Sequence, residues 1–323
     1  MNSAKSYFGG LSCYVSGGWN RFWFEPSDVF DLCVLRVLVG GMALIWQVSF
    51  AADLTTWFAV NGWLNDAVAS GLLADTTGYN YSYLRFDNHP TVLWIAHWLG
   101  SCVLFAFMIG LWTRFTAIGS LVVMLSYAHR ALILAGPAEP VLTMLVFYLC
   151  FASVGAYLSV DARSRKPASS QLTWSWWSTL ARRLIQVHLI IVYLAMTFTA
   201  LGSETWWNGD AIWWVSAQPD SRLFDFTFLR EYPILINLWT HTILVGTLFF
   251  VVCVWNEWLR PLAIVISILI WISLAFATGN VAHSAVMIVA NLAFVPSDFW
   301  RSLLGRSLLA SSESKLTGSE SAN

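Results

Sequence analysis

Residues 183–214, RLIQVHLIIVYLAMTFTALGSETWWNGDAIWW, determine how the rest of the chain must fold. Apolar side chains run almost without interruption from 183 to 201, which as a helix nearly matches the hydrocarbon thickness of a bilayer. The run ends at Gly-Ser-Glu-Thr, and a Trp-Trp-Asn-Gly-Asp-Ala turn and a second Trp pair follow. The stretch therefore predicts a membrane-spanning helix that places a polar, aromatic cluster at one face of the membrane.

The composition extends this prediction to the whole chain. Of the 323 residues, 58% are hydrophobic and 11% are charged, whereas a soluble domain has about 25% charged residues. The apolar runs are long and do not alternate with polar residues, so we expect an all-α, polytopic transmembrane helical bundle. The net charge of −1 gives no reason to expect a nucleic-acid partner, and the twenty tryptophans suit aromatic belts at the membrane surfaces.

The apolar runs predict about eight spans. They cover residues 29–50, 91–112, 115–134, 140–158, 183–201, 233–255, 261–277 and 282–294. Residues 1–25 predict an interfacial N-terminal segment, 26–298 a transmembrane domain, and 299–323 a polar tail that we expect to be disordered. Two long loops, 51–90 and 202–232, interrupt the spans.

The basic residues predict an orientation. With a cytoplasmic N-terminus and eight spans, most lysines and arginines fall on the cytoplasmic side, as the positive-inside rule requires. Both long loops and the end of the 183–214 stretch then lie together on the outer face. The N-terminus has no compact apolar region with a cleavage site, so we expect the first span, rather than a signal peptide, to direct insertion.

The arginine, cysteine and histidine residues in or near the apolar runs show no pattern typical of a catalytic or metal site. Arg36 lies about two turns into the first span, where snorkelling to the interface and a structural ion pair are equally good interpretations. The five cysteines are scattered without a Cys-x-x-Cys pair, which argues against disulfides and zinc. Four histidines lie in or beside spans without ligand spacing, so we predict no metal site and expect hydrogen bonds between helices. They are His97, His188, His241 and His283.

Four segments resemble, in order and approximate spacing, motifs of the horizontally transferred transmembrane (HTTM) domain family. They are FDLCVLRVLVGG (30–41), the segment 110–142 that begins GLWTRFTAIG, FASVGAYLSVDA (151–162) and VYLAMTFTALGSETWWNGDAIWW (192–214). The resemblance covers about residues 28–215. It implies that 26–298 is an HTTM-like domain, and we expect it in a bacterial-type inner (plasma) membrane.

The family includes the vitamin K-dependent γ-glutamyl carboxylase, a membrane enzyme that uses a reduced quinone, O2 and CO2 to carboxylate glutamates. The resemblance implies a site on the outer face near the end of the fifth span, and a reduced quinone as its cofactor. In the carboxylase, a lysine followed by leucine in that span is the proposed base. Here that position is Ala200, preceded by Thr199, and the chain's three lysines are all expected on the cytoplasmic side. The best-understood chemistry of the family is therefore not encoded in this chain.

Other ionisable residues predicted near the outer face are candidates to replace that base. They are Glu204, Asp210, Glu139 and His129. A turn followed by a helix cap is a competing interpretation of Asp210, which follows Asn-Gly. The candidate ligand-binding residues are Trp206, Trp207, Asn208 and Arg130. The two tryptophans also suit an interfacial belt.

Two functions of different classes follow from these observations. The first is a non-carboxylating HTTM protein that binds a membrane lipid, or a secreted or membrane peptide, and assists maturation, transport or protection. The resemblance extends to a bacterial protein required for maturation of a secreted toxin. The second is an enzyme, a carboxylase-like lyase or a quinol-dependent enzyme, that acts on a quinone or lipid with a substituted base. We favour the first because the expected lysine, and a histidine expected between the third and fourth spans, are both missing.

Overall fold

The computed structural model describes residues 14–74, 82–130, 134, 136–164, 174–218 and 223–304. The long helices of the described chain are α2 (Phe30–Ser49), α5 (Pro90–Ile109), α6 (Thr113–Arg130), α7 (Ala138–Leu149), α9 (Trp176–Leu201), α12 (Pro233–Cys253), α13 (Arg260–Thr278) and α14 (Val281–Asn291). The shorter ones are α3 (Leu54–Phe58), α4 (Asp66–Ala74), α8 (Val160–Arg163), α10 (Glu204–Trp207), α11 (Ala211–Ser216) and the 3₁₀ turns η1 (Phe50–Asp53), η2 (Tyr83–Arg85), η4 (Thr227–Glu231) and η5 (Leu292–Phe294). Two-residue strands β1 (Ser27–Asp28) and β2 (Trp174–Ser175) pair antiparallel, and residues 14–24 and Ser297–Leu304 are also helical.

Several of these helices suit a membrane, which confirms the all-α class and fits an integral membrane protein. Those long and apolar enough to cross a bilayer, among the described residues, are Phe30–Phe58, Pro90–Ile109, Trp176–Leu201, Pro233–Cys253 and Arg260–Thr278. Val281–Phe294 and Ser297–Leu304, bent by 105°, make a sixth if they form one span. Helix α7 has 12 residues and is too short to span a bilayer by itself. The predicted count of about eight spans therefore stays a prediction.

Two predicted boundaries differ from the structure. The predicted span 140–158 is helical only as far as Leu149, and a turn follows. The span predicted from 183 begins at Trp176, because no proline or glycine interrupts the chain between 176 and 201. Of the predicted tail, residues 299–304 belong to the last helix and 305–323 lie outside the described residues, as do residues 1–13 of the predicted interfacial segment.

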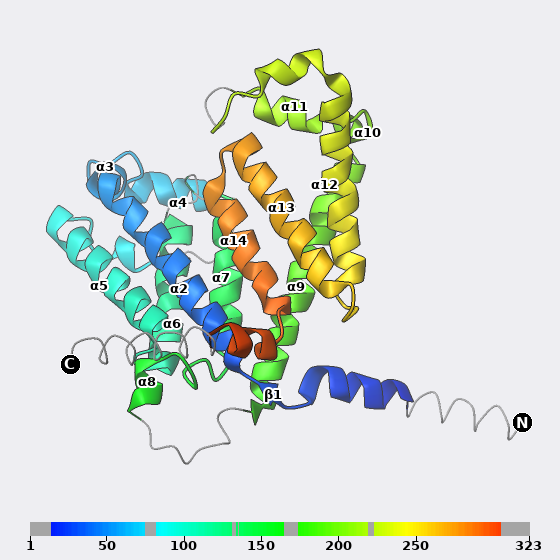
Figure 1. Cartoon of the computed structure of the whole chain (residues 1–323). Coiled ribbons are helices and arrows are strands. Elements are labelled where there is room, and N and C mark those ends of the chain that lie inside the picture. Colours follow the sequence, from blue (N-terminus) through cyan, green and yellow to red (C-terminus); the bar gives the residue numbers. More distant parts are fainter. Residues whose placement is uncertain are drawn as a thin grey trace, which may run out of the picture.

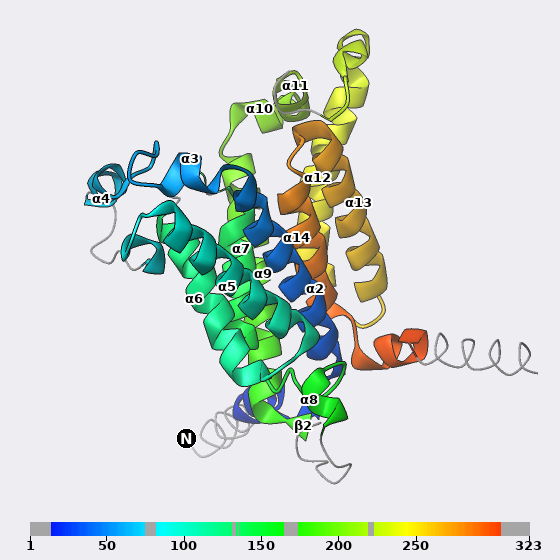
Figure 2. The same cartoon turned by 90° about the vertical axis from the view of Figure 1, so that its left-hand side faces the viewer.

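The helices form a bundle whose two ends carry different structures (Figures 1 and 2). One end, called here the loop end, carries α3, α4, α10 and α11. The opposite end, called the basal end, carries α8, the β1–β2 pair, helix 14–24 and helix 297–304. The described parts of both long loops therefore belong to the same end of the bundle.

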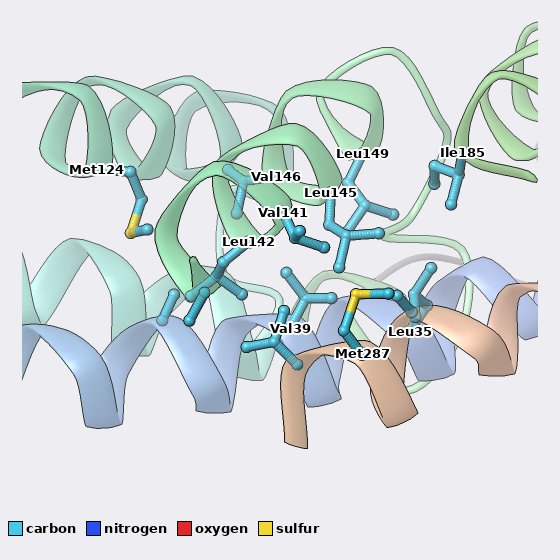
Figure 3. Packing of buried hydrophobic residues seen from close by; sticks show 14 of the residues in the cluster. Leu35, Val39, Met124, Val141, Leu142, Leu145, Val146, Leu149, Ile185 and Met287 are labelled. Carbon is cyan, nitrogen blue, oxygen red and sulfur yellow. The ribbon is translucent and has the colours of Figure 1, made fainter. Parts of the chain in front are cut away.

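Helix α7 forms the centre of the hydrophobic core. Figure 3 shows its leucines and valines between Leu35 and Val39 of α2, Met124 of α6, Ile185 of α9 and Met287 of α14. The fully or nearly fully buried residues of α7 are Ala138, Glu139, Val141, Leu142, Leu145, Val146 and Leu149. A helix that is apolar around most of its circumference packs stably only when other helices surround it.

The turn after α7 is held by Arg36, which is fully buried in α2. Its Nη1 donates to the carbonyl of Val154 (2.8 Å), and its Nη2 donates to the carbonyl of Leu158. These contacts are with backbone carbonyls rather than with a carboxylate or with solvent. Gly110 allows this close approach, since its φ is +75° and a Cβ there would lie 2.5 Å from Nη1 of Arg36.

The same turn also caps helix α6. The Asp161 carboxylate accepts hydrogen bonds from the backbone N–H groups of Trp112 and Thr113, both at 2.9 Å, and from the Thr113 hydroxyl. In return, the Asp161 N–H donates to the carbonyl of Gly110 (3.1 Å). A carboxylate at a helix N-terminus satisfies free N–H groups and interacts favourably with the helix dipole. We refer to Arg36, Gly110, Thr113 and Asp161 as the basal tie.

Replacing Asp161 tests the basal tie. Asp161→Ala leaves the N–H groups of Trp112 and Thr113 without their acceptor, so we expect a loss of about 1–2 kcal/mol of stability and a lower midpoint of thermal unfolding in detergent. Asp53→Ala is the matched control, because Asp53 is exposed and its side chain makes no cap hydrogen bond at the start of α3. Equal unfolding midpoints for the two variants would contradict the assigned role of Asp161.

Candidate functional site

A cavity of about 320 Å³ lies at the loop end, among α9, α12, α13 and α14. Its lining is mainly apolar and consists of Pro137, Met196, Thr197, Ala200, Trp206, Ile212, Val215, Ile243, Leu244, Thr247, Trp271, Leu274, Thr278, Asn280, His283 and Ser284. Met196 is 38% exposed on the outer surface of α9. The cavity wall therefore reaches the side of the bundle that would face lipid.

Helices α10 and α11 lie at the loop end (Figure 1), and they contribute Trp206, Ile212 and Val215 to the cavity wall. Helix α9 stops at Leu201, and the indole N–H of Trp207 donates back to the Leu201 carbonyl at 2.6 Å. Gly209 then adopts a left-handed φ of +80° and lies against Asn237 of α12, where a Cβ would be 1.7 Å from the Asn237 side-chain oxygen. Only glycine fits this position, and the turn directs Trp206 and Ile212 into the cavity wall.

The polar part of the cavity comes from the turn between α13 and α14. Gly279 ends α13 in the left-handed conformation, and the Asn280 side chain caps α14 by accepting from the N–H of His283 (3.2 Å). This cap fixes the imidazole of His283 in the first turn of α14. Its Nδ1 is buried and has no hydrogen-bond partner among the described residues. The polar atom of a ligand or an ordered water molecule can supply the partner that such a group needs.

A buried network behind Trp271 makes the cavity wall rigid. The Trp271 ring packs edge-on against His283, with centroids 5.0 Å apart, and its indole N–H donates to the Tyr193 hydroxyl at 2.6 Å. That hydroxyl also contacts Ser267 (2.7 Å) and Asn291 (3.0 Å). Because one network joins α9, α13 and α14, the three helices that carry the polar part of the cavity hold a fixed spacing.

Glu139 lies beside the cavity rather than in its lining. Its Oε1 accepts from the indole N–H of Trp46 (2.9 Å), and its Oε2 is buried without a hydrogen-bond partner among the described residues. Pro137, two residues earlier, is part of the cavity wall next to His283. Glu139 and His283 are also close enough to interact electrostatically. A carboxylate and an imidazole therefore flank one side of the cavity.

The other predicted site residues do not gather at one place. Trp206 lines the cavity, and so does Ala200, the position at which the sequence resemblance leads one to expect a lysine. Glu204, Trp207 and Asn208 are exposed and do not line it. Asp210 occupies the N-cap position of α11, as the helix-cap interpretation expects, but its side chain makes no cap hydrogen bond. The Ile212 N–H instead donates to the hydroxyl of Thr240 (3.3 Å).

His129 and Arg130 belong to a different part of the loop end. They form the last turn of α6, and neither lines the cavity. Arg130 is buried, and its Nη2 donates to the carbonyl of Phe58 in α3 at 3.4 Å. The structure therefore separates these two candidates from Trp206 and Ala200.

Sequence reasoning did not single out His283. The expectation of helix-to-helix hydrogen bonds is confirmed for His97, which contacts Tyr127 of α6 (2.9 Å), and for His188, which contacts Tyr148 of α7 (3.0 Å). It is wrong for His241, whose partner is the Asn237 carbonyl of its own helix. The signal that marks His283 is local, since Thr-Gly-Asn places an N-cap residue three positions before it.

A second buried polar cluster lies between α2, α5 and α6. It contains Gln47, His97 and Tyr127, and the hydroxyl of Tyr83 from η2 is also buried. Burial raises the pKa of Tyr83, so this phenol stays protonated at neutral pH.

The chain matches no protein-family model, no curated protein and no solved structure. Within the described ranges, no three His, Cys, Asp or Glu side chains are grouped so that they could hold a metal ion. The assignment of a function therefore rests on the cavity itself. Its shape and lining suit the apolar part of a ligand with one small polar group.

Proposed function

We propose that this protein is a non-carboxylating, HTTM-like membrane protein that binds a membrane lipid in the cavity at the loop end. Binding would serve maturation, transport or protection, with a secreted or membrane peptide as a further partner. The observation that carries the proposal is an apolar cavity in which the buried Nδ1 of His283 has no hydrogen-bond partner within the described chain. A volume of about 320 Å³ holds a headgroup or ring and part of a chain. The rest of the ligand's hydrocarbon chain would leave the cavity past Met196 and enter the bilayer.

The lining supports binding rather than carboxylation. Ala200 is buried in the cavity wall, and its methyl group can neither accept nor donate a proton. The lysines Lys5, Lys166 and Lys315 lie outside the described residues, and the sequence predicts all three on the cytoplasmic side. The position at which the family resemblance implies a base is therefore an apolar contact surface for a ligand.

The proposed orientation places the cavity toward the outer face of a bacterial-type inner membrane. Arginines are concentrated on elements of the basal end, namely Arg21, Arg114, Arg163, Arg182, Arg183, Arg260 and Arg301. The loop end carries Arg85, Arg130 and Arg230. The positive-inside rule then favours a cytoplasmic basal end and eight crossings, with the shorter α6 and α7 shielded by their neighbours.

The family resemblance implies a reduced quinone as cofactor, and the residues that line the cavity are compatible with binding one. Ile243, Leu244 and Leu274 supply apolar contacts for a ring and an isoprenoid tail. The imidazole of His283 can exchange a hydrogen bond with a ring hydroxyl. When bound, such a quinol would supply reducing equivalents. The residues of this chain would orient it, and the Trp206 roof would exclude water.

The lipid-binding proposal predicts that filling the cavity removes the ligand. Ala200→Leu adds side-chain volume inside the cavity, so we expect the amount of lipid that co-purifies per protein, measured by extraction and mass spectrometry, to fall severalfold. Ala195→Leu is the matched control, since Ala195 is exposed on the same helix. If both variants retain as much lipid as the unmodified protein, the cavity is not the binding site.

Helices α10 and α11, which adjoin the cavity at the loop end, provide a second pair of variants for the same measurement. Gly209→Ala forces a side chain into Asn237 and a strained φ, so it should displace α10 and α11 and release the lipid. Gly202→Ala is the control, because Gly202 has a φ of −79° and its Cβ would meet only ordinary contacts at 3.5 Å or more.

The enzyme alternative is favoured by one specific observation, the pairing of Glu139 with His283 beside the cavity. Both carry a buried polar atom without a partner among the described residues, as an acid–base pair awaiting a substrate would. If the protein is an enzyme, product formation from a menaquinol-type lipid under O2 and CO2 should be lost in Glu139→Gln. It should persist in Glu204→Gln, because Glu204 is exposed away from the cavity.

Mass spectrometry of the lipid and of a co-expressed peptide would measure this reaction. The absence of any product with the unmodified protein would contradict the enzyme alternative and leave the lipid-binding proposal in place. Equal loss of product in the Glu139 and Glu204 variants would contradict the assignment of Glu139.

A further inference from the structure

A second pocket, of about 370 Å³ and mostly polar, opens at the basal end on the opposite side of the bundle from the cavity. It is lined by Ser27, Asp28, Asp31, Arg182, Arg183, Gln186, Val254, Trp255, Glu257, Arg260, Ala293, Phe294, Val295, Pro296, Ser297 and Asp298. The segments that meet here are the start of α2, the start of α9, the turn between α12 and α13, and the end of α14. None of these residues takes part in the proposed binding of lipid at the loop end.

Part of the pocket's charge is already neutralised. The guanidinium of Arg182 contacts both Asp31 oxygens, with Nε to Oδ2 and Nη2 to Oδ1 both at 2.6 Å. Arg301 donates to the Asp28 carboxylate at 2.8 Å. Ser297 adds a hydrogen bond to Asp31 (3.1 Å). These pairs hold the pocket's rear wall together and leave no free charge there.

Arg183 and Arg260 differ from Arg182, because neither has a carboxylate partner within the described chain. Arg183 donates from Nε to the Phe22 carbonyl (3.2 Å) and from Nη1 to the Gln186 side chain (2.9 Å), and its guanidinium lies 4.4 Å from the centroid of the Phe22 ring. Arg260 donates from Nε to the Val254 carbonyl at 3.1 Å. All these acceptors are neutral.

Arg183 lies within electrostatic range of Arg182, Arg260 and Asp31, and both Arg183 and Arg260 are only partly buried. Nη2 of Arg183 and both Nη atoms of Arg260 make no hydrogen bond within the described residues. Two guanidinium groups that line one pocket and keep free N–H donors supply the chemistry that binds phosphate oxygens. A phosphate would also remove the repulsion between the two positive charges.

Exposed tryptophans place this pocket at the depth of lipid headgroups. Trp255 lines the pocket and is 36% exposed, and Trp258 in the same turn is 91% exposed. Trp19 is 60% exposed on helix 14–24, whose Phe22 packs against Trp255. Tryptophan side chains concentrate at membrane–water interfaces. The phosphate nearest to this pocket in the cell would therefore be that of a phospholipid.

The pocket rim carries two exposed carboxylates. Glu257 precedes α13, Asp298 lies on the last helix, and neither forms an ion pair among the described residues. Their negative charge repels a headgroup with net negative charge and attracts an ammonium group. Phosphate inside and ammonium at the rim is the charge arrangement of an ethanolamine phospholipid.

We propose that the basal pocket binds the headgroup of a phosphatidylethanolamine-type lipid, with its phosphate held by Arg183 and Arg260 and its ammonium held by Glu257 and Asp298. Gln186 positions the guanidinium of Arg183, since its Oε1 accepts from Nη1 while its Nε2 donates to the Ala293 carbonyl (2.8 Å). The bound lipid would link helix 14–24 to the turn between α12 and α13.

Native mass spectrometry of the full-length protein, titrated with single lipids of matched acyl chains, tests the proposal. Phosphatidylethanolamine should bind more tightly than phosphatidylglycerol. The double variant Arg183→Gln/Arg260→Gln should bind phosphatidylethanolamine about tenfold more weakly, because it loses charge-assisted hydrogen bonds. Arg230→Gln, an exposed arginine of the loop end, is the matched control and should bind as the unmodified protein does.

Two further measurements make each part of the proposal falsifiable. If the double variant does not fold, Arg260→Gln alone serves as the test, because it leaves the contacts of Arg183 in place. We expect it to weaken binding as well. Glu257→Gln/Asp298→Asn should retain binding and lose the preference for ethanolamine over glycerol headgroups. Unchanged affinity in both arginine variants would overturn the site. If the protein binds inorganic phosphate at millimolar concentration and retains no phospholipid, the pocket is a free-phosphate site. That result would overturn the lipid assignment.

Discussion

The carboxylate of Asp161 makes the contacts on which the rest of the bundle depends. Asp161 follows the turn after α7, and its carboxylate caps the start of α6. There it accepts from the N–H groups of Trp112 and Thr113, which would otherwise be unpaired. Arg36 holds the other side of that turn through the carbonyls of Val154 and Leu158. Unpaired backbone groups are costly where water is scarce. The basal tie thus explains why segments 30–41, 110–142 and 151–162, far apart in sequence, contain the residues that meet here.

At the loop end, the short helix α7 leaves part of the space to the cavity. Helix α7 is only 12 residues long and is enclosed by α2, α6, α9 and α14, while α9 has 26 residues. Pro137, just before α7, is already part of the cavity wall. Helix α9 continues past α7 on this side, and the cavity lies among α9, α12, α13 and α14, with α10 and α11 contributing Trp206, Ile212 and Val215 to its wall. The basal end is thus held together by the hydrogen bonds of the basal tie, and the loop end encloses an apolar cavity.

Much of the fold could be predicted from the sequence, because long apolar runs leave few alternatives to helices. The end of the predicted span 140–158 could not, since the turn after Leu149 depends on tertiary contacts with Arg36 and Thr113. For the site, the sequence pointed to the end of α9 and to Trp206, which does line the cavity. It also pointed to Glu204 and Asn208, which are exposed, because a polar cluster in sequence does not reveal which side chains face inward. The Thr-Gly-Asn cap places His283 in the first turn of α14, but it does not show that the imidazole faces a cavity, because that depends on tertiary contacts with Trp271 of α13 and with Pro137.

An experimental structure of the protein in lipid nanodiscs would test the central claim most directly. The account predicts elongated, non-protein density between α9, α12, α13 and α14, with a polar end within hydrogen-bond distance of Nδ1 of His283. It also predicts that this density passes Met196 toward the surrounding lipid. A cavity that holds only water, or one closed by side chains with Nδ1 of His283 bonded to the protein itself, would contradict the account.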